Sequence, residues 1–259
     1  MDRRFEDRVA IVTGSSSGIG KATALRLARE GAAVCVSADR NAQGGQATAD
    51  EIQAHGGRAV FVQANVAEAD GCRRIFDETL RSFGRVDVLV NNAGITRFRS
   101  LEDTDEALWD QVININLKSM YLLCRLVIPD MLSRGRGSVV NVSSVHAVMT
   151  QPGGFAYAAA KAGICGLTRA AGVAYGARGV RVNCILPGTI DISLYPPGNQ
   201  ETDLAAWRPR ANPAQVLARH GSPDEIAAVI AFLASDDASF VNAAVLVADG
   251  GLLSLLKDF

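Results

Sequence analysis

The sequence carries no strong excess of charge of either sign. Over 259 residues, 26 Lys and Arg nearly balance 27 Asp and Glu, and the formal net charge is −1. No basic stripe suits nucleic acid, and no polybasic run suits a membrane surface. Charged residues make up 20% and apolar residues 48% of the chain. A substantial core is therefore expected, and wholesale disorder is not.

Long apolar segments are also missing. No run approaches the roughly 20 apolar residues that span a membrane. The charged start passes directly into a short apolar run, unlike a signal peptide. We therefore expect a cytoplasmic protein without a membrane partner.

Cysteine and histidine are sparse. The three histidines and five cysteines form no paired metal-ligand spacing, so no metal site is expected. Reduced thiols in or near the core would suit a cytoplasmic protein. The cysteines are Cys35, Cys72, Cys124, Cys165 and Cys184.

The chain does contain a regular alternation of apolar runs and amphipathic stretches. Strands are predicted at 8–14, 32–38, 58–66, 86–94, 137–144, 180–188 and 243–251. Helices are predicted at 20–31, 44–57, 68–84, 105–135, 156–179 and 222–237. Strands that are apolar on both faces, with helices between them, indicate a parallel sheet covered on both sides. The sequence thus predicts an α/β protein with a doubly wound, seven-stranded parallel sheet.

One region breaks this rhythm. Segment 191–221 contains four prolines and little periodicity. Long irregular inserts in compact domains are usually lids or binding loops. We therefore predict a single domain over 1–259, with a substrate lid at about 191–221.

A glycine-rich turn, TGSSSGIG at 13–20, directly follows the first predicted strand and opens the first helix. Glycines at 14, 18 and 20 allow a tight turn and let a phosphate approach free N–H groups at a helix start. The usual GxGxxG spacing is absent because position 23 is Thr. The turn predicts a dinucleotide site, with an ordinary strand–helix turn as the alternative.

Asp39 follows the second predicted strand. A carboxylate at this place can accept hydrogen bonds from both adenosine ribose hydroxyls and would repel a 2′-phosphate, which favours NAD over NADP. Arg40 points the other way, because an arginine in this turn can clamp a 2′-phosphate. We predict NAD as the preferred cofactor and keep NADP as the alternative.

Tyr157 and Lys161 lie four residues apart and share one helix face. A tyrosine with a pKa near 10 is a poor base at neutral pH, but a nearby ammonium favours the phenolate. The pair can therefore act as a general acid/base between an alcohol and a carbonyl. Ser144, at the end of the fifth predicted strand, would hydrogen-bond the reacting oxygen.

Together these motifs resemble the short-chain dehydrogenases/reductases in their short, single-domain form. The matching pieces are TGSSSGIG, NNAG (91–94), NINLKS (114–119), VSS (142–144), YAAAK (157–161), PG (187–188) and GSPDEIAAVIAFLASDDASF (221–240). They occur in the family's order over nearly the whole chain. The resemblance implies a Rossmann fold and an oxidoreductase that transfers a hydride between a nicotinamide cofactor and a CH–OH group.

The resemblance also implies residue roles. Tyr157 is the acid/base, Lys161 lowers its pKa and holds the nicotinamide ribose, and Ser144 rather than Ser143 polarises the substrate. Asn116 kinks the long helix and anchors a water near Lys161. The implied cofactor residues are Gly14, Ser16, Ser17, Gly18, Ile19, Gly20, Asp39, Arg40, Asn65, Val66, Asn92, Ala93, Gly94, Tyr157, Lys161, Pro187, Gly188 and Ile190.

Three positions depart from the family pattern. Asn65 replaces the usual aspartate before Val66, and its amide can still pair with adenine. Asp39 comes one residue later than in typical NAD-preferring members. Ile192 stands where many members have a threonine that holds the carboxamide, and Ser193 could substitute for it.

The substrate is expected to be small and polar: a sugar, polyol or hydroxy acid. His146 is either a pocket donor to a substrate oxygen or a surface residue. Arg97 and Arg99 could bind a substrate carboxylate or hydroxyls, or lie on a solvated loop. Besides Arg97 and His146, Ser144 and Tyr157 are expected to contact the substrate. Two alternatives are an NADPH-dependent carbonyl reductase of a less polar ketone and a non-catalytic nucleotide-binding regulator.

Partners other than a small-molecule substrate are expected to be copies of the same chain. Helices 105–134 and 155–178 carry apolar residues on more than one face. Such surfaces pair in relatives into dimers and tetramers, so the resemblance implies a homotetramer or homodimer.

Overall fold

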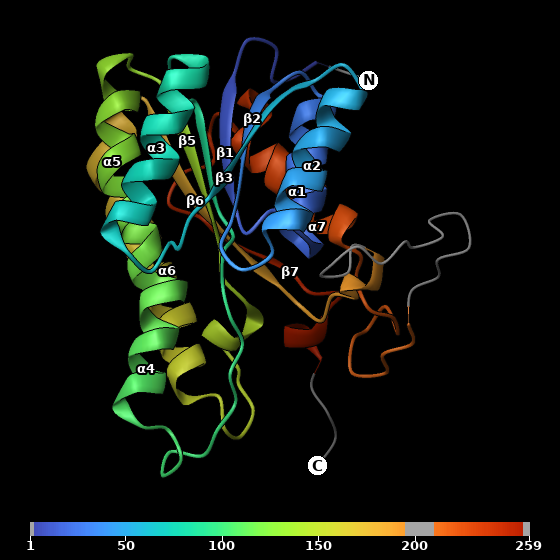
Figure 1. Cartoon of the computed structure of the whole chain (residues 1–259). Coiled ribbons are helices and arrows are strands. Elements are labelled where there is room, and N and C mark those ends of the chain that lie inside the picture. The colour runs from blue at the N-terminus through green and yellow to red at the C-terminus, as the bar shows by residue number, and fades with distance from the viewer. Residues whose placement is uncertain (1–2, 195–209, 256–259) are drawn as a thin grey trace.

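A computed structural model describes residues 3–194 and 210–255. At its centre is one seven-stranded sheet in the order β3-β2-β1-β4-β5-β6-β7, with every neighbouring pair parallel (Figure 1). The strands are β1 (Val9–Thr13), β2 (Ala33–Ala38), β3 (Arg58–Gln63), β4 (Val88–Asn91), β5 (Gly137–Val142), β6 (Val180–Pro187) and β7 (Val245–Ala248). The predicted doubly wound sheet is confirmed.

Two helical layers cover the sheet. The helices are α1 (Gly18–Arg29), α2 (Ala42–Ala54), α3 (Ala69–Phe83), α4 (Glu106–Ile113), α5 (Ser119–Ser133), α6 (Phe155–Tyr175) and α7 (Pro223–Ala234). Figure 1 shows α1, α2 and α7 on one face and α3, α5 and α6 on the other. One buried cluster joins the sheet to Leu27 and Ile230, and a second joins it to Ile75 and Val127.

The strands form where the sequence is apolar on both faces. All residues of β1, β2 and β5 are buried. Side chains alternate between the two faces of a strand, so a continuous apolar run can pack against both helical layers at once. The edge strand β3 is half-exposed and ends at Gln63, so the predicted cofactor residues Asn65 and Val66 lie in the loop beyond it.

The helix predicted over 105–135 is interrupted. A π-helical turn, η1 (Asn114–Lys118), separates α4 from α5. Asn116 explains the interruption, because its side-chain amide donates to the carbonyl of Val112 at 2.9 Å, four residues earlier. A regular α-helix would offer that carbonyl to a backbone N–H. Apolar spacing does not report this competition, so the sequence pattern indicates a continuous helix.

The winding of the chain reverses at β1, which pairs with β2 on one side and β4 on the other. Open α/β sheets bind ligands at such a switch point, beyond the carboxyl ends of the strands. The glycine-rich turn, the NNAG segment and Ser144 all follow strands that end at this edge.

The predicted lid at 191–221 is described only at its two ends, and 195–209 lie outside the described residues. These ends pair with each other through Asp191 N to Gly221 O at 2.9 Å and Gly221 N to Thr189 O at 3.0 Å. Helix α7 begins with a capping box, in which Ser222 and Glu225 each accept from the other's backbone N–H.

One helical stretch, Glu106–Ser133, is long and apolar enough to cross a membrane by length and composition. In its most apolar window, 44% of the residues are buried inside the protein. This stretch contains α5, whose Leu123, Val127 and Met131 pack in the core against the sheet. Packing within the fold therefore explains part of its apolar character.

Candidate active site

The glycine-rich turn between β1 and α1 forms a cradle of backbone groups. Gly14 has a φ of 64°, and a Cβ at Gly20 would lie 2.2 Å from the Gly14 carbonyl oxygen. Side chains at these two positions would therefore disrupt the turn. Ser17 caps α1 without a side-chain hydrogen bond, and the first turn of α1 has no acidic residue. The helix start thus presents free N–H groups to an anion.

A cavity of about 370 Å³ opens beside this turn. Its lining includes Gly14, Ser16, Asp39, Arg40, Asn65, Val66, Ala93, Gly94 and Arg97. The buried hydroxyl of Ser37, another lining residue, has no hydrogen-bond partner in the described part of the protein. An unpaired buried hydroxyl in a polar cavity suits a polar ligand. The cavity therefore fits the adenosine half of a dinucleotide.

Asn92 braces the glycine-rich turn. Its side-chain amide donates to the carbonyls of Thr13 at 2.9 Å and Gly14 at 3.2 Å. The Thr13 hydroxyl in turn accepts from the backbone N–H groups of Asn92 and Ala93, both at 3.0 Å. The two loops are thereby tied together at the switch point. Sequence reasoning missed Thr13, whose place at the end of β1 is its only signal.

The chemical end of the site lies where β5 and α6 meet. Ser143 and Ser144 follow β5, and both are buried. The Ser143 hydroxyl donates to the Lys161 carbonyl at 2.7 Å, whereas the Ser144 hydroxyl accepts from the His146 backbone N–H at 3.2 Å. The hydroxyl proton of Ser144 is left available to the site. This difference supports Ser144 over Ser143 as the substrate-polarising serine.

Burial raises the pKa of the Tyr157 phenol, and interactions with the side chains of Thr96 and Ser144 only partly offset this. The hydroxyl is therefore protonated at neutral pH in the unliganded chain. The structure brings Tyr157 and Ser144 together. Thr96 was not identified from the sequence, because nothing in its loop pattern distinguishes it.

Lys161 is fully enclosed beside this tyrosine. Its ammonium donates to the Val142 carbonyl at 3.1 Å and lies 5.4 Å from the centre of the Tyr157 ring. Burial lowers the pKa of Lys161 to about 8. At pH 7 the group is still mainly protonated, so it places a positive charge close to the phenol.

Asn116 links the π-helical turn to the loop that precedes the site. Its amide donates to the Ile95 carbonyl at 3.0 Å, and its oxygen accepts from the Ile95 N–H at 3.2 Å. A Cβ at Gly94 would lie 2.6 Å from that oxygen and 3.6 Å from the Lys161 nitrogen. Gly94 is therefore required for the close approach of Asn116.

Three aromatic rings meet at the mouth of the site. The ring centres of Phe98 and His146 lie 5.4 Å apart, and those of His146 and Tyr157 lie 5.5 Å apart. The His146 Nδ1 atom is 2.9 Å from the Thr150 hydroxyl, and burial lowers the pKa of His146. His146 thus borders the reacting centre as a mainly neutral ring at pH 7. Phe98 was not anticipated, because the loop after NNAG gave no periodic signal.

The two arginines of this loop do not join the rings. Arg97 is exposed, donates to the Thr96 carbonyl at 3.0 Å and lines the adenosine-side cavity. Arg99 is exposed and donates to the Phe98 carbonyl at 2.9 Å. A substrate contact for Arg97 stays a prediction, and its position in the present structure is on the cofactor side.

The segment that follows β6 packs near β7 and the start of α1. Gly188 packs against Asp249, to whose Cα a Cβ would come within 2.7 Å, and Ile190 pairs with Gly221. Ile192, at the position where a threonine was expected, faces Gly18 at the start of α1. Pro187, Gly188 and Ile190 thus lie in a segment whose continuation at Ile192 reaches the start of α1.

Known proteins are similar to this chain in sequence and in fold. A family model described as Enoyl-(Acyl carrier protein) reductase matches residues 14–253. The chain is 39% identical over 253 residues to the 3-oxoacyl-[acyl-carrier-protein] reductase of Thermotoga maritima, covering 96% of this chain and 99% of that protein. It is 41% identical over 254 residues to the cis-4-hydroxycyclohexanecarboxylate dehydrogenase of Sinomonas cyclohexanicum, covering 97% and 98%.

Among solved structures, the fold is similar to acetoin dehydrogenase from Salmonella typhimurium. The TM-score is 0.90 and the sequence identity 32%, with 97% of this chain and 98% of that chain covered. The similarity therefore extends over nearly the whole length of both chains.

Proposed function

The chain belongs to the short-chain dehydrogenase/reductase family, and we propose that it interconverts a small secondary alcohol and its ketone. It is an oxidoreductase of CH–OH and ketone groups, so the non-catalytic regulator considered from the sequence is excluded. The observation that carries the proposal is the convergence of Ser144, Tyr157 and Lys161 beside the dinucleotide cavity.

The family uses a nicotinamide cofactor, which when bound accepts or donates the hydride of the reaction. The glycine-rich turn would hold its phosphates, and the cavity beside Asp39 and Asn65 its adenosine. Lys161, next to Gly94, would hold the nicotinamide ribose. The NAD preference predicted from Asp39 is retained in this proposal.

Side chains of the protein carry out the proton transfer of the reaction. Tyr157 carries its proton at neutral pH, because burial raises its pKa, and can donate it to a ketone oxygen. Ser144 donates a hydrogen bond to the same oxygen and stabilises the charge that develops there. In the reverse direction Tyr157 must act as a base, and the ammonium of Lys161 favours the phenolate that this requires.

The substrate we propose is a compact secondary alcohol with a polar or carboxylate group, such as a hydroxy acid. His146 offers one polar contact, while the ring of Phe98 provides an apolar wall. The names of the Sinomonas and Salmonella relatives support small hydroxy acids and hydroxy ketones. The ring wall also suits an alicyclic substrate, which is less polar than the sugars considered from the sequence.

A substrate panel tests this proposal. Turnover is followed as NADH absorbance with hydroxycyclohexanecarboxylates, acetoin, polyols and a 3-oxoacyl thioester. We expect the highest kcat/KM with a compact hydroxy acid or hydroxy ketone. Turnover of the thioester alone would favour the reductase activity named for the Thermotoga relative instead.

Cofactor choice has a specific alternative. Arg40 and Arg97 both line the adenosine cavity with Asp39, and two guanidiniums there could attract a 2′-phosphate. Fluorescence titration with NADH and NADPH decides between the two. We expect NADH to bind more tightly, and Asp39→Ala to reduce the difference. Tighter binding of NADPH to the unaltered chain would overturn the NAD proposal.

We propose a homotetramer or homodimer on the basis of exposed apolar side chains. Trp109, Tyr121 and Phe155 are exposed on α4, α5 and α6, and Val247 is exposed on the edge strand β7. Such faces are typical of contacts between copies. A cytoplasmic location is proposed with them, since all five cysteines are free and buried. Light scattering that gives a monomer mass would refute the assembly.

A further inference from the structure

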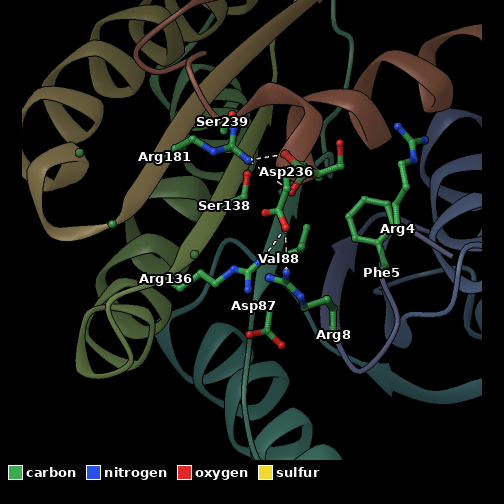
Figure 2. Close-up of a pocket in the computed structure, with 15 residues that line it drawn as sticks. Arg4, Phe5, Arg8, Asp87, Val88, Arg136, Ser138, Arg181, Asp236 and Ser239 are labelled. Atoms are coloured by element: carbon green, nitrogen blue, oxygen red, sulfur yellow. Dashed lines mark hydrogen bonds and ion pairs between the residues drawn. The ribbon is translucent and has the colours of Figure 1, made fainter. Parts of the chain in front are cut away.

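A second cavity lies at the other edge of the sheet, where the strands begin. It has a volume of about 240 Å³ and is lined by residues that precede or open β1, β4, β5 and β6, together with the segment after α7 (Figure 2). Its lining contains four arginines and two acids: Arg4, Arg8, Arg136, Arg181, Asp87 and Asp236. The cavity therefore carries an excess of positive charge. None of the residues assigned to the active site lines it.

Two of these guanidinium groups converge on one carboxylate oxygen. Arg8, just before β1, places Nη2 3.1 Å from Asp236 Oδ2, and Arg136, just before β5, donates to the same oxygen. Figure 2 shows both arginines directed at this carboxylate. One acid cannot neutralise two cations. The Asp236 side chain is 69% exposed, so it can leave this position for solvent.

Arg181 adds a third cation without a carboxylate of its own. Its guanidinium donates to backbone carbonyls at the end of α7, including Leu233 at 2.8 Å and Ser235 at 2.7 Å. Within 3–194 and 210–255, no ion pair involves it. Burial lowers the pKa of Arg181, and the charge of Arg136 lowers it further against the opposing effect of Asp236. An additional anion would stabilise this half-buried charge.

Arg4 and Asp87 already have ion-pair partners of opposite charge. Arg4 pairs with Glu30 at 2.7 Å and Asp237 at 3.1 Å. Asp87 accepts from the Val9 N–H at 2.9 Å and pairs with an arginine outside the cavity lining. The positive charge without a matched carboxylate is therefore that of Arg8, Arg136 and Arg181, of which Arg181 is held by backbone carbonyls.

We propose that this cavity binds a phosphate group, either free phosphate or a small phosphate monoester. Its volume is below the roughly 300–1,000 Å³ of pockets for drug-sized ligands. The guanidinium groups of Arg8 and Arg136 can each contact a different phosphate oxygen, and the nearby charge of Arg181 adds to the attraction. The oxygen of Asp236 that Arg8 and Arg136 now share marks the place of one phosphate oxygen. The ligand displaces this carboxylate from the two arginines.

Calorimetric titration with sodium phosphate at constant ionic strength tests the site. The start of α1 can also attract phosphate, so the decisive comparison is between variants. Arg8→Gln/Arg136→Gln leaves α1 intact and should weaken binding by at least about tenfold. Arg73→Gln, on the exposed face of α3, is the matched control and should bind like the unaltered chain. Circular dichroism and cofactor titration confirm that each variant is folded.

Asp236→Asn provides an independent test, because it should change phosphate affinity in the opposite direction. It removes the competing carboxylate and should tighten phosphate binding severalfold. Equal binding in the double variant and the unaltered chain would overturn the proposal, as would weaker binding in Asp236→Asn. So would the absence of binding up to about 10 mM, where even a millimolar site is occupied. Parallel titration with glycerol 3-phosphate distinguishes a monoester from free phosphate as the preferred ligand.

Discussion

The Ser143 hydroxyl donates a 2.7 Å hydrogen bond to the carbonyl of Lys161. This bond ties the segment after β5 to helix α6. The hydroxyl of Ser144, the next residue, accepts a hydrogen bond from the His146 N–H and lies near Tyr157. The two adjacent serines therefore differ: Ser143 positions α6, and in the proposed mechanism Ser144 contacts the substrate.

This division predicts opposite phenotypes. Ser144→Ala should lower kcat by about 10²-fold or more, because a hydrogen bond to the developing charge is lost, with little change in stability. Ser143→Ala should reduce the free energy of unfolding by about 1 kcal/mol, because a buried hydrogen bond is lost. Urea titration and steady-state kinetics on both variants measure the two effects. A larger loss of kcat in Ser143→Ala would reverse the assignment.

Replacing the phenol tests the acid/base. Tyr157→Phe should lower kcat by about 10²–10⁴-fold, the usual contribution of general acid–base catalysis. Cofactor affinity should stay close to that of the unaltered chain. Tyr175→Phe, at the end of the same helix, is the matched control and should retain activity. Tyr157→Phe with unchanged kcat would disprove the mechanism.

Lys161 makes stability depend on pH in a defined direction. Burial lowers its pKa from the ordinary 10.5 to about 8, so the folded chain releases this proton at lower pH than the unfolded chain does. The buried charge destabilises the fold below pH 8, and this penalty disappears as the pH rises from about 8 to 10.5. Lys161→Met should therefore be more stable than the unaltered chain at pH 7, by up to about 3 kcal/mol.

The advantage of Lys161→Met should shrink toward zero by about pH 10, a pH above the folded and near the unfolded pKa of the lysine. Urea unfolding of both proteins without cofactor, from pH 7 to 10, measures it. Lys118→Met, which replaces an exposed lysine, serves as the control. A stability difference that grows with pH would contradict a lowered pKa for Lys161.

The rings beside Tyr157 predict a specificity effect. His146→Ala should lower kcat/KM by about tenfold, or ~1.4 kcal/mol, mainly through KM, because a polar contact at the mouth is lost. Phe98→Ala should affect alicyclic substrates more than open-chain ones, since its ring forms the apolar wall. His55→Ala, on the exposed end of α2, is the control. Equal KM values for His146→Ala and the unaltered chain would remove His146 from the substrate site.

The thiols of Cys35 and Cys124 should be inert in the folded state. All five cysteines are buried and free, and burial raises the pKa of Cys35 and Cys124 to about 12. Thiolates are the reactive species, so a thiol reagent at pH 8 should label these two residues only after unfolding. Rapid labelling without denaturant would show that the described core opens readily.

The sequence predicts the sheet well because its signal is local and redundant. Each strand is an apolar run, each helix an amphipathic stretch, and Ser222 with Glu225 defines one helix start. The chemical end was equally accessible, because four-residue spacing on a helix fixes Tyr157 and Lys161 on one face.

What the sequence did not predict depends on contacts between distant segments. Phe98 reaches His146 only because the Arg99 N–H pairs with the Gly153 carbonyl at 3.0 Å, and Thr13 meets Asn92 only across two strands. The raised pKa of Tyr157 likewise follows from burial, which the sequence does not report. The arginine cavity combines residues from four strand starts, so no linear motif marks it.

The π-helical turn at Asn114–Lys118 contains one residue more than a regular helix would need there. A π turn holds one residue more than an α turn, so removing one residue there would let α4 and α5 join as one regular helix. That deletion would improve the helix and withdraw the amide that now holds Ile95. The same one-residue deletion would thus make the helix more regular and remove the hydrogen bonds between Asn116 and Ile95.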